Sequence, residues 1–289
     1  MTMKKKWFSY IFFALILTLF FLYVLFPGDQ IKNFVVFHLN KNNVDINIAI
    51  DRIKPAFPPG IRLYNVQINQ MPDAVLVLEK IKIVPDYLSL FRSNILFFFK
   101  ANTCEGIIDG KTTLARNRSF NMVNVDATIK GVQISKIKAL QGLNSRNISG
   151  VLEGRLTYNN DQVSGEDVKA TLVLSDVKIE LLNPMLMLDA VAFNSIESSI
   201  VVKNRRVHFK QFNLKGDQMD GIIAGSIVLE KPLEKSVLKL VGTIRPHPTL
   251  LANLEKDIPK NLIPKKFFSK NGLPIKLGGT IEQPTFSMN

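Results

Sequence analysis

The chain has 289 residues, of which 46% are hydrophobic and 21% charged, and its formal net charge is +13 at pH 7. This composition excludes a disordered or low-complexity protein and is typical of one large folded domain or two modest ones. The single cysteine, Cys104, excludes an internal disulfide, and we expect its thiol to fill a buried apolar position.

The N-terminal segment has the pattern of a membrane anchor. Three lysines, Lys4 to Lys6, precede an apolar run over residues 7–26 that contains no charge. About 20 helical residues at roughly 1.5 Å each span the hydrocarbon core of a bilayer, and the run lacks the small residues of a signal cleavage site. The sequence therefore predicts an uncleaved transmembrane anchor over residues 7–26, with residues 1–6 in the cytoplasm and the rest of the chain on the far side.

The part beyond the anchor is strongly basic. Its formal charge is 13 − 3 = +10, because the three lysines lie before the anchor and residues 7–26 carry none. Such an excess favours anionic lipid head groups or an acidic protein partner. Nucleic acid is not an expected partner at that location.

After the anchor, the periodicity changes from helical to alternating. Pro27 and Gly28 break the helix, and Asp29 can cap a short helix over residues 31–39. From residue 44 onward, apolar and polar residues alternate in short segments separated by Gly, Asn, Asp or Pro, which predicts an antiparallel all-β architecture. The predicted strands are 44–51, 61–68, 74–84, 94–100, 105–115, 120–129, 148–158, 168–174, 196–202, 206–214, 221–229 and 236–244. Short helices are expected at 85–91, 134–140 and 248–254.

Glycines four residues apart recur in these strands. The three pairs are Gly106 with Gly110, Gly150 with Gly154, and Gly221 with Gly225. Positions four apart in a strand point to the same face, so each pair leaves a bare patch that permits bending or close approach by a neighbour. Chance recurrence of glycine is the alternative.

The sequence lacks the patterns of known catalytic and metal sites. The three histidines, His38, His208 and His247, are far apart, and none has a second ligand at metal-binding spacing. The segment 224–228 lacks the second glycine of a nucleophile elbow, and 278–280 lacks the frame of a phosphate-binding loop. Five carboxylates would be candidate site residues if the fold paired them in space, namely Asp109, Asp126, Glu153, Glu166 and Asp220. We predict no enzyme activity, no cofactor, and no catalytic, cofactor-binding or metal-binding residues.

Two strands are apolar on both faces, namely 74–78 and 95–99. One interpretation is that protein covers both faces. The other is that one face lines a hydrophobic groove that is open to lipid or to an apolar segment of a partner.

Several short motifs resemble the type II secretion system protein N family and its AsmA-like relatives. They are residues 26–29 after the anchor, 53–63, 86–91, 106–110 and 277–286. The resemblance implies a bacterial inner-membrane protein whose periplasmic β-rich domain, residues 27–289, is an elongated antiparallel sheet curled into a half-open groove. Cys104 and the strongly basic balance depart from the family pattern.

Two functional hypotheses follow from the resemblance and the strand pattern. The leading one is an accessory or assembly component of type II protein secretion, which contacts other secretion components in the inner membrane and periplasm through strand edges and apolar patches. The other is an AsmA-like lipid-binding or intermembrane lipid-transport protein, with phospholipid in the groove and Lys80, Lys82 and Lys100 guiding head groups at its rim.

Overall fold

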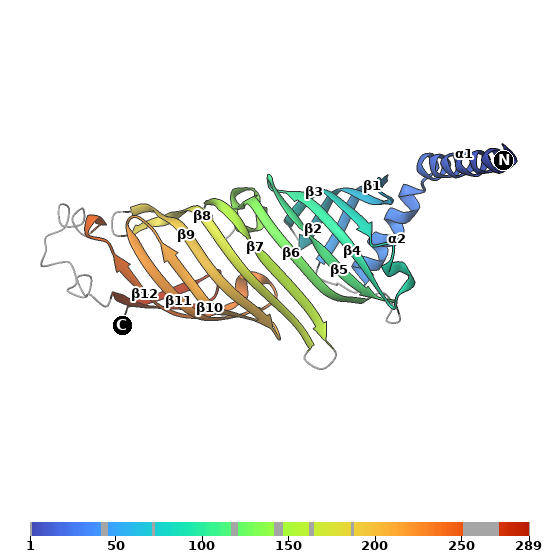
Figure 1. The fold of residues 1–289 in the computed structure, drawn as a ribbon. Coiled ribbons are helices and arrows are strands. Elements are labelled where there is room, and N and C mark those ends of the chain that lie inside the picture. The colour runs from blue at the N-terminus through green and yellow to red at the C-terminus, as the bar shows by residue number, and fades with distance from the viewer. Residues whose placement is uncertain are drawn as a thin grey trace, which may run out of the picture.

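The computed structural model describes residues 2–41, 46–70, 73–116, 121–141, 147–161, 165–185, 188–250 and 272–288. These residues form one antiparallel sheet of 14 strands, in which each strand pairs with its neighbours along the chain (Figure 1). The bounds of the first seven strands are β1 Ile46–Ala56, β2 Gly60–Gln70, β3 Asp73–Pro85, β4 Asn94–Thr103, β5 Gly106–Ala115, β6 Asn121–Gln133 and β7 Ile148–Asp161. The others are β8 Gly165–Met185, β9 Leu188–Lys203, β10 Arg206–Lys215, β11 Met219–Val228, β12 Val237–Pro246, β13 Leu273–Gly279 and β14 Pro284–Met288.

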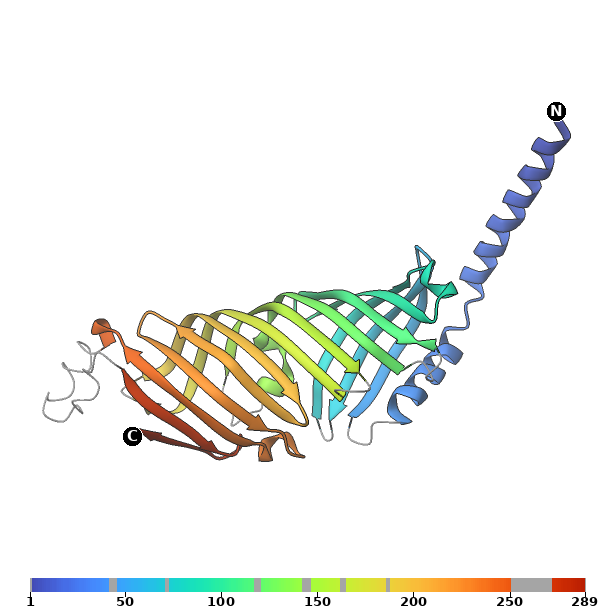
Figure 2. The same ribbon diagram turned by 60° about the horizontal axis from the view of Figure 1, so that its bottom comes forward.

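The sheet is long, curved and open. The first and last strands, β1 and β14, do not pair with each other among the described residues, so the strands do not close into a ring. Viewed in Figure 2, the strands arch across the molecule, and the chain runs from the N-terminal end to the C-terminal end along its long dimension. The mostly β architecture, with one long antiparallel sheet and few helices, confirms this part of the predicted fold class, whereas the half-open groove stays a prediction.

Helices are few and lie mainly at the N-terminal end. They are α1 Thr2–Val24, α2 Gly28–Lys41, α3 Lys138–Gln141 and the 3-10 turns η1 Ser89–Phe91, η3 Ile134–Lys136 and η5 Leu233–Lys235. Within the described part of the chain, none of the helices reaches the combined length and apolar content that a membrane crossing requires. The anchor predicted for residues 7–26 therefore stays a prediction.

One hydrophobic cluster joins α2 to the first three strands. Its buried residues Ile50, Ile53, Leu63 and Val66 come from β1 and β2, and helix residues such as Val35 pack against them. The helix turns one apolar side to the sheet because its apolar residues recur at helical spacing, as the sequence predicted for residues 31–39. At this end of the molecule, α2 covers one face of the sheet.

A second cluster lies on strands β8 to β13. Its buried members are Val177, Phe193, Ile196, Leu214, Met219, Leu250 and Leu273. Leu250 comes from the helical residues 248–250, which follow β12, so this connection covers the sheet near one end of its strands. The rest of the helix predicted over 248–254 lies outside the described residues.

The predicted strands all overlap β1 to β12, with residues 44, 45 and 120 lying outside the described residues. The helix predicted over 85–91 is wrong except for η1, because β3 continues to Pro85 and the Ser89 hydroxyl closes a tight turn. That hydroxyl donates a hydrogen bond to the Asp86 carbonyl (2.6 Å) and accepts one from the Leu96 N–H (2.9 Å). The helix predicted over 134–140 is present as η3 and α3.

Candidate functional site

The sheet has one face that is apolar from end to end. Residues directly opposite one another in antiparallel strands share a face, so the strand register assigns each side chain to one side of the sheet. Following the register through all 14 strands gives a continuous row with one apolar residue from each strand, which we call the central row. It consists of Pro55, Ile61, Ile83, Phe99, Gly110, Ala127, Leu156, Ala170, Ile200, Phe209, Gly225, Leu240, Leu277 and Phe286.

Two further rows flank the central row on the same face, and we call the three rows together the apolar face. One flanking row has Ser198 as its single polar member and consists of Ile53, Leu63, Ile81, Ala101, Ile108, Ile129, Gly154, Leu172, Ser198, Phe212, Ile223, Gly242, Ile275 and Met288. The other runs from β3 to β12 and consists of Pro85, Phe97, Thr112, Val125, Tyr158, Val168, Val202, Val207, Ile227 and Leu238.

The middle of the apolar face is only half-buried. Central-row residues such as Phe99, Leu156, Ile200, Phe209 and Leu240 are intermediate in exposure, and they belong to neither of the two core clusters. The covering elements α2 and the 248–250 segment contact other parts of the sheet, and the η3–α3 connection packs against β7 and β3. In the stretch between α2 and the 248–250 segment, the apolar face presents uncharged side chains that an apolar ligand can contact.

One glycine of each sequence pair lies on the apolar face, namely Gly110, Gly154 and Gly225. Gly110 lies beside the Phe99 ring, where an added Cβ would come within 2.9 Å of the ring and would also clash with the Asp126 carbonyl oxygen. Gly225 has a φ of +135°, a left-handed conformation that favours glycine, and it lies opposite Phe209. The predicted close approach is therefore present, because a side chain at these positions would collide with its neighbours.

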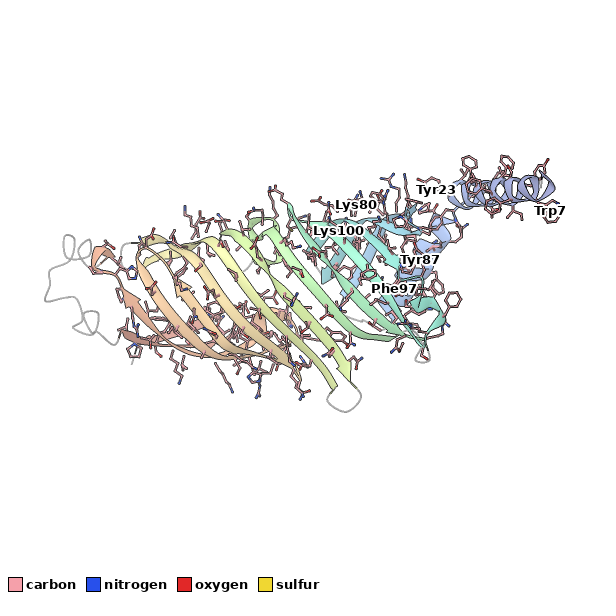
Figure 3. The ribbon with its side chains drawn as sticks, in the orientation of Figure 1. Trp7, Tyr23, Lys80, Tyr87, Phe97 and Lys100 are labelled. Atoms are coloured by element: carbon pink, nitrogen blue, oxygen red, sulfur yellow. The ribbon has the colours of Figure 1, made fainter. Side chains whose placement is uncertain are left out.

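The opposite face, which we call the polar face, is mostly polar, although it also carries the exposed side chains of Phe98, Ile222 and Val241. A row that alternates with the central row consists of Lys82, Lys100, Asp109, Thr128, Arg155, Thr171, Ser199 and Gln211. Lys80, Lys82 and Lys100 lie on this polar face of neighbouring strands, where Figure 3 labels Lys80 and Lys100. These three lysines do not project from the apolar face, and their role at the rim of a groove stays a prediction.

Two candidate carboxylates of the polar face form ion pairs with lysines. Asp126 lies 3.5 Å from Lys111, and Asp109 lies 3.2 Å from Lys130. Both aspartates line a pocket of about 550 Å³ beside Phe98, whose side chain is 50% exposed. Glu153 is exposed on the same face, and the side chain of Glu166 lies outside those described.

His247 and Asp220 form a hydrogen-bonded pair in which the pKa values of both groups shift. His247 Nε2 lies 2.9 Å from Asp220 Oδ2, and its Nδ1 lies 3.1 Å from the Asp217 carbonyl oxygen. The hydrogen bond to Asp220 raises the pKa of His247, and the same bond lowers the pKa of Asp220. Both ring nitrogens face oxygen acceptors, which favours the doubly protonated imidazole and fastens the β10–β11 turn to the end of β12.

The remaining candidates lie apart from one another. His38 is on α2, where Nδ1 lies 2.9 Å from the Phe34 carbonyl oxygen, and His208 is on β10. No group of three or more potential metal ligands occurs among the described residues. Cys104 is buried, with 8% exposure, as predicted.

No family model matches the chain, and neither curated proteins nor solved structures give a significant match. The resemblance to type II secretion protein N therefore stays a prediction. The sequence analysis offered an apolar face for two strands but not its continuity, because alternation predicts which residues of one strand share a face, whereas only the register shows that the faces of all strands join.

Proposed function

We propose that the protein binds lipid acyl chains along its apolar face while α1 attaches it to a bacterial inner membrane. The observation that carries this proposal is the central row, an unbroken line of uncharged apolar residues across all 14 strands. Soluble proteins rarely leave contiguous apolar surface of this extent uncovered, and a long apolar surface without polar anchors fits a long apolar ligand. The curled, half-open groove that the resemblance implies is part of this proposal.

The energetics favour a chain-like ligand. Each methylene removed from water contributes about 0.8 kcal/mol, so about a dozen methylenes contribute roughly 10 kcal/mol. The entropy lost on association and on ordering of the ligand costs about 4–15 kcal/mol, which is similar in size to this gain. An acyl chain of ordinary length is therefore near the minimum that the apolar face can retain, and a phospholipid with two chains binds more tightly.

Membrane attachment is supported by the surface of α1. Its large apolar side chains are exposed along the helix, and Figure 3 shows Trp7 near one end and Tyr23 near the other. Aromatic residues of this kind concentrate at the two interfaces of a bilayer, and Lys4 to Lys6 favour a cytoplasmic N-terminus. On this proposal the sheet lies in the periplasm. Recovery of the full chain in the supernatant of an alkaline membrane wash would contradict the attachment.

Lipid binding is tested by native mass spectrometry of the full chain released from membranes in mild detergent, with lipid extraction alongside. We expect stoichiometric phospholipid. A chain that carries no lipid, and takes up none when phospholipid is added, refutes the proposal.

A second candidate function is an accessory role in type II secretion through protein contacts. The observation that favours it is that β1 and β14 each have a single neighbouring strand among the described residues, so each presents an edge to which a partner strand can add. Pulldown of the full chain from native membranes that recovers no secretion component would exclude this role. Neither candidate requires a cofactor or a catalytic group.

A further inference from the structure

Two neighbouring chain connections carry the most exposed apolar side chains outside the helices α1 and α2. Phe57 lies in the β1–β2 turn and is 83% exposed, and Leu88 and Phe91 lie in the β3–β4 connection with 72% and 90% exposure. We call these three residues the loop tip. No contact in the sheet explains them, since side chains this exposed contribute little to folding.

Hydrogen bonds join the two connections and hold the loop tip in place. The Tyr87 hydroxyl in the second connection donates to the Pro59 carbonyl in the first (2.9 Å), and the Lys82 ammonium donates to the Phe57 carbonyl (3.0 Å). The Arg116 guanidinium donates to the Leu90 carbonyl (2.9 Å) from the far side. The loop tip is therefore a pre-formed surface, because its backbone is fixed while its apolar side chains point away from the protein.

The charge around the loop tip is basic. The stretches 53–62 and 82–93 contain one acidic residue, Asp86, and the basic residues Lys54, Arg62, Lys82 and Arg92. Apolar side chains bordered by basic residues fit the interface of an anionic bilayer, where the apolar groups enter the head-group region and the cations contact lipid phosphates. A protein partner would have to match the shape of three projecting side chains, whereas a bilayer adapts to them.

The loop tip also lies at the end of the molecule from which α1 departs. Gly28, between α1 and α2, packs so closely on β1 that an added Cβ would lie 2.5 Å from the Ile53 carbonyl oxygen, and Ile53 is four residues before Phe57. Figures 1 and 2 both show the β3–β4 connection and the C-terminal end of α1 at this same end. A membrane that holds α1 is therefore near the loop tip.

We propose that Phe57, Leu88 and Phe91 dock this end of the sheet on the surface of an anionic phospholipid bilayer. The docking rests on the membrane attachment of the proposed function, but it does not require that the apolar face hold lipid. It gives the sheet a second point of contact beside α1, which fixes its orientation on the membrane.

Tryptophan fluorescence of the full chain in vesicles tests the docking. The sequence has one tryptophan, Trp7, so Trp7→Phe combined with Phe91→Trp places a single reporter at the loop tip. Trp7→Phe combined with Leu233→Trp is the matched control, because Leu233 is also exposed in a chain connection but lies in η5, next to β12 and outside the apolar face. The vesicles contain phosphatidylcholine and phosphatidylglycerol, with brominated phospholipid as the quencher.

We expect the Phe91 reporter to be quenched about twofold more than the Leu233 reporter, with emission at shorter wavelength. Arg92→Glu in the same background should reduce the quenching in anionic vesicles and leave it unchanged in phosphatidylcholine alone. Equal quenching of the two reporters in chain that is bound to vesicles overturns the docking and leaves the attachment standing. Chain that does not associate with vesicles overturns both, and lipid occupancy measured in detergent remains an independent test of the apolar face.

Discussion

Leu156 offers the sharpest test of the apolar face. It lies in the central row between Ala127 and Ala170, two small neighbours that leave its side chain half-buried. Leu156→Glu would place a carboxylate in the middle of the proposed acyl-chain path. Strands are about 4.8 Å apart, so an extended acyl chain that crosses one strand contacts it with roughly four methylenes. Loss of their burial, at about 0.8 kcal/mol each, removes about 3 kcal/mol of binding free energy, or roughly a hundredfold in Kd.

The matched control is Thr157→Glu, one residue further along β7. Thr157 lies on the polar face between Asp126 and Lys169, so a carboxylate there meets one charge of each sign. Each variant should lower the free energy of unfolding by about 1 kcal/mol, which a urea titration measures. Phospholipid retained after purification is then measured by native mass spectrometry. If Leu156→Glu retains as much lipid as Thr157→Glu, lipid does not lie on the central row and the reasoning fails.

Three further predictions concern stability. Gly110→Ala should lower the free energy of unfolding by about 1–3 kcal/mol through its collision with the neighbouring strand, whereas Gly278→Ala, where an added Cβ meets one side-chain oxygen at 3.1 Å, should lower it by less than about 1 kcal/mol. Equal thermal midpoints for the two variants would contradict this. Thr103 is buried and donates a hydrogen bond to a β3 carbonyl (2.7 Å), so Thr103→Val should destabilise the chain by about 1–2 kcal/mol in a urea titration, and Thr103→Ser should retain most of that stability. His247→Gln should remove a pH dependence of stability. The raised pKa of His247 contributes stability that is fully present below about pH 6.5 and is lost as the pH rises through the folded-state pKa of His247. The lowered pKa of Asp220 contributes stability that is present above about pH 3.9 and is lost as the pH falls through the folded-state pKa of Asp220. Both side chains are more than a third exposed, so the free energy of unfolding should differ between wild type and His247→Gln by less than about 1 kcal/mol at pH 5.5, and by less still at pH 8. A difference in unfolding free energy that grows with pH would refute the assignment.

Local patterns predicted the strands well where alternation was strict. Strands β1 to β7 begin within about two residues of their predicted starts, among the residues the structure describes, because Gly, Asn or Pro marks each turn. The lengths of β8 and β9 were underestimated. β8 continues through Asp176, whose φ is +52°, and this irregularity moves the apolar residues from the even positions 172 and 174 to the odd positions 177 and 179. Because the apolar residues move from even to odd positions, a search for strict alternation ends β8 too early.

The last two strands, β13 and β14, were not predicted as strands. Leu273–Gly279 is short, with Pro274 and two glycines that argue against a strand in isolation. It forms because β12 supplies a partner, with Leu240 opposite Leu277 and Ile244 opposite Leu273. The candidate site depends in the same way on pairing between strands, because only the register joins apolar residues of different strands into one row.

The strand order has a consequence for how the protein is assembled. Since each strand pairs only with its neighbours in the sequence, most native pairings join segments that are close along the chain. Such a topology needs few long loop closures, and each new hairpin can add to an edge that has already formed. The sheet can therefore grow from β1 toward β14 in the order of synthesis. The length of the molecule is then set by the number of hairpins, so that adding or removing one antiparallel pair changes the reach of the central row by about 10 Å without rearranging the rest.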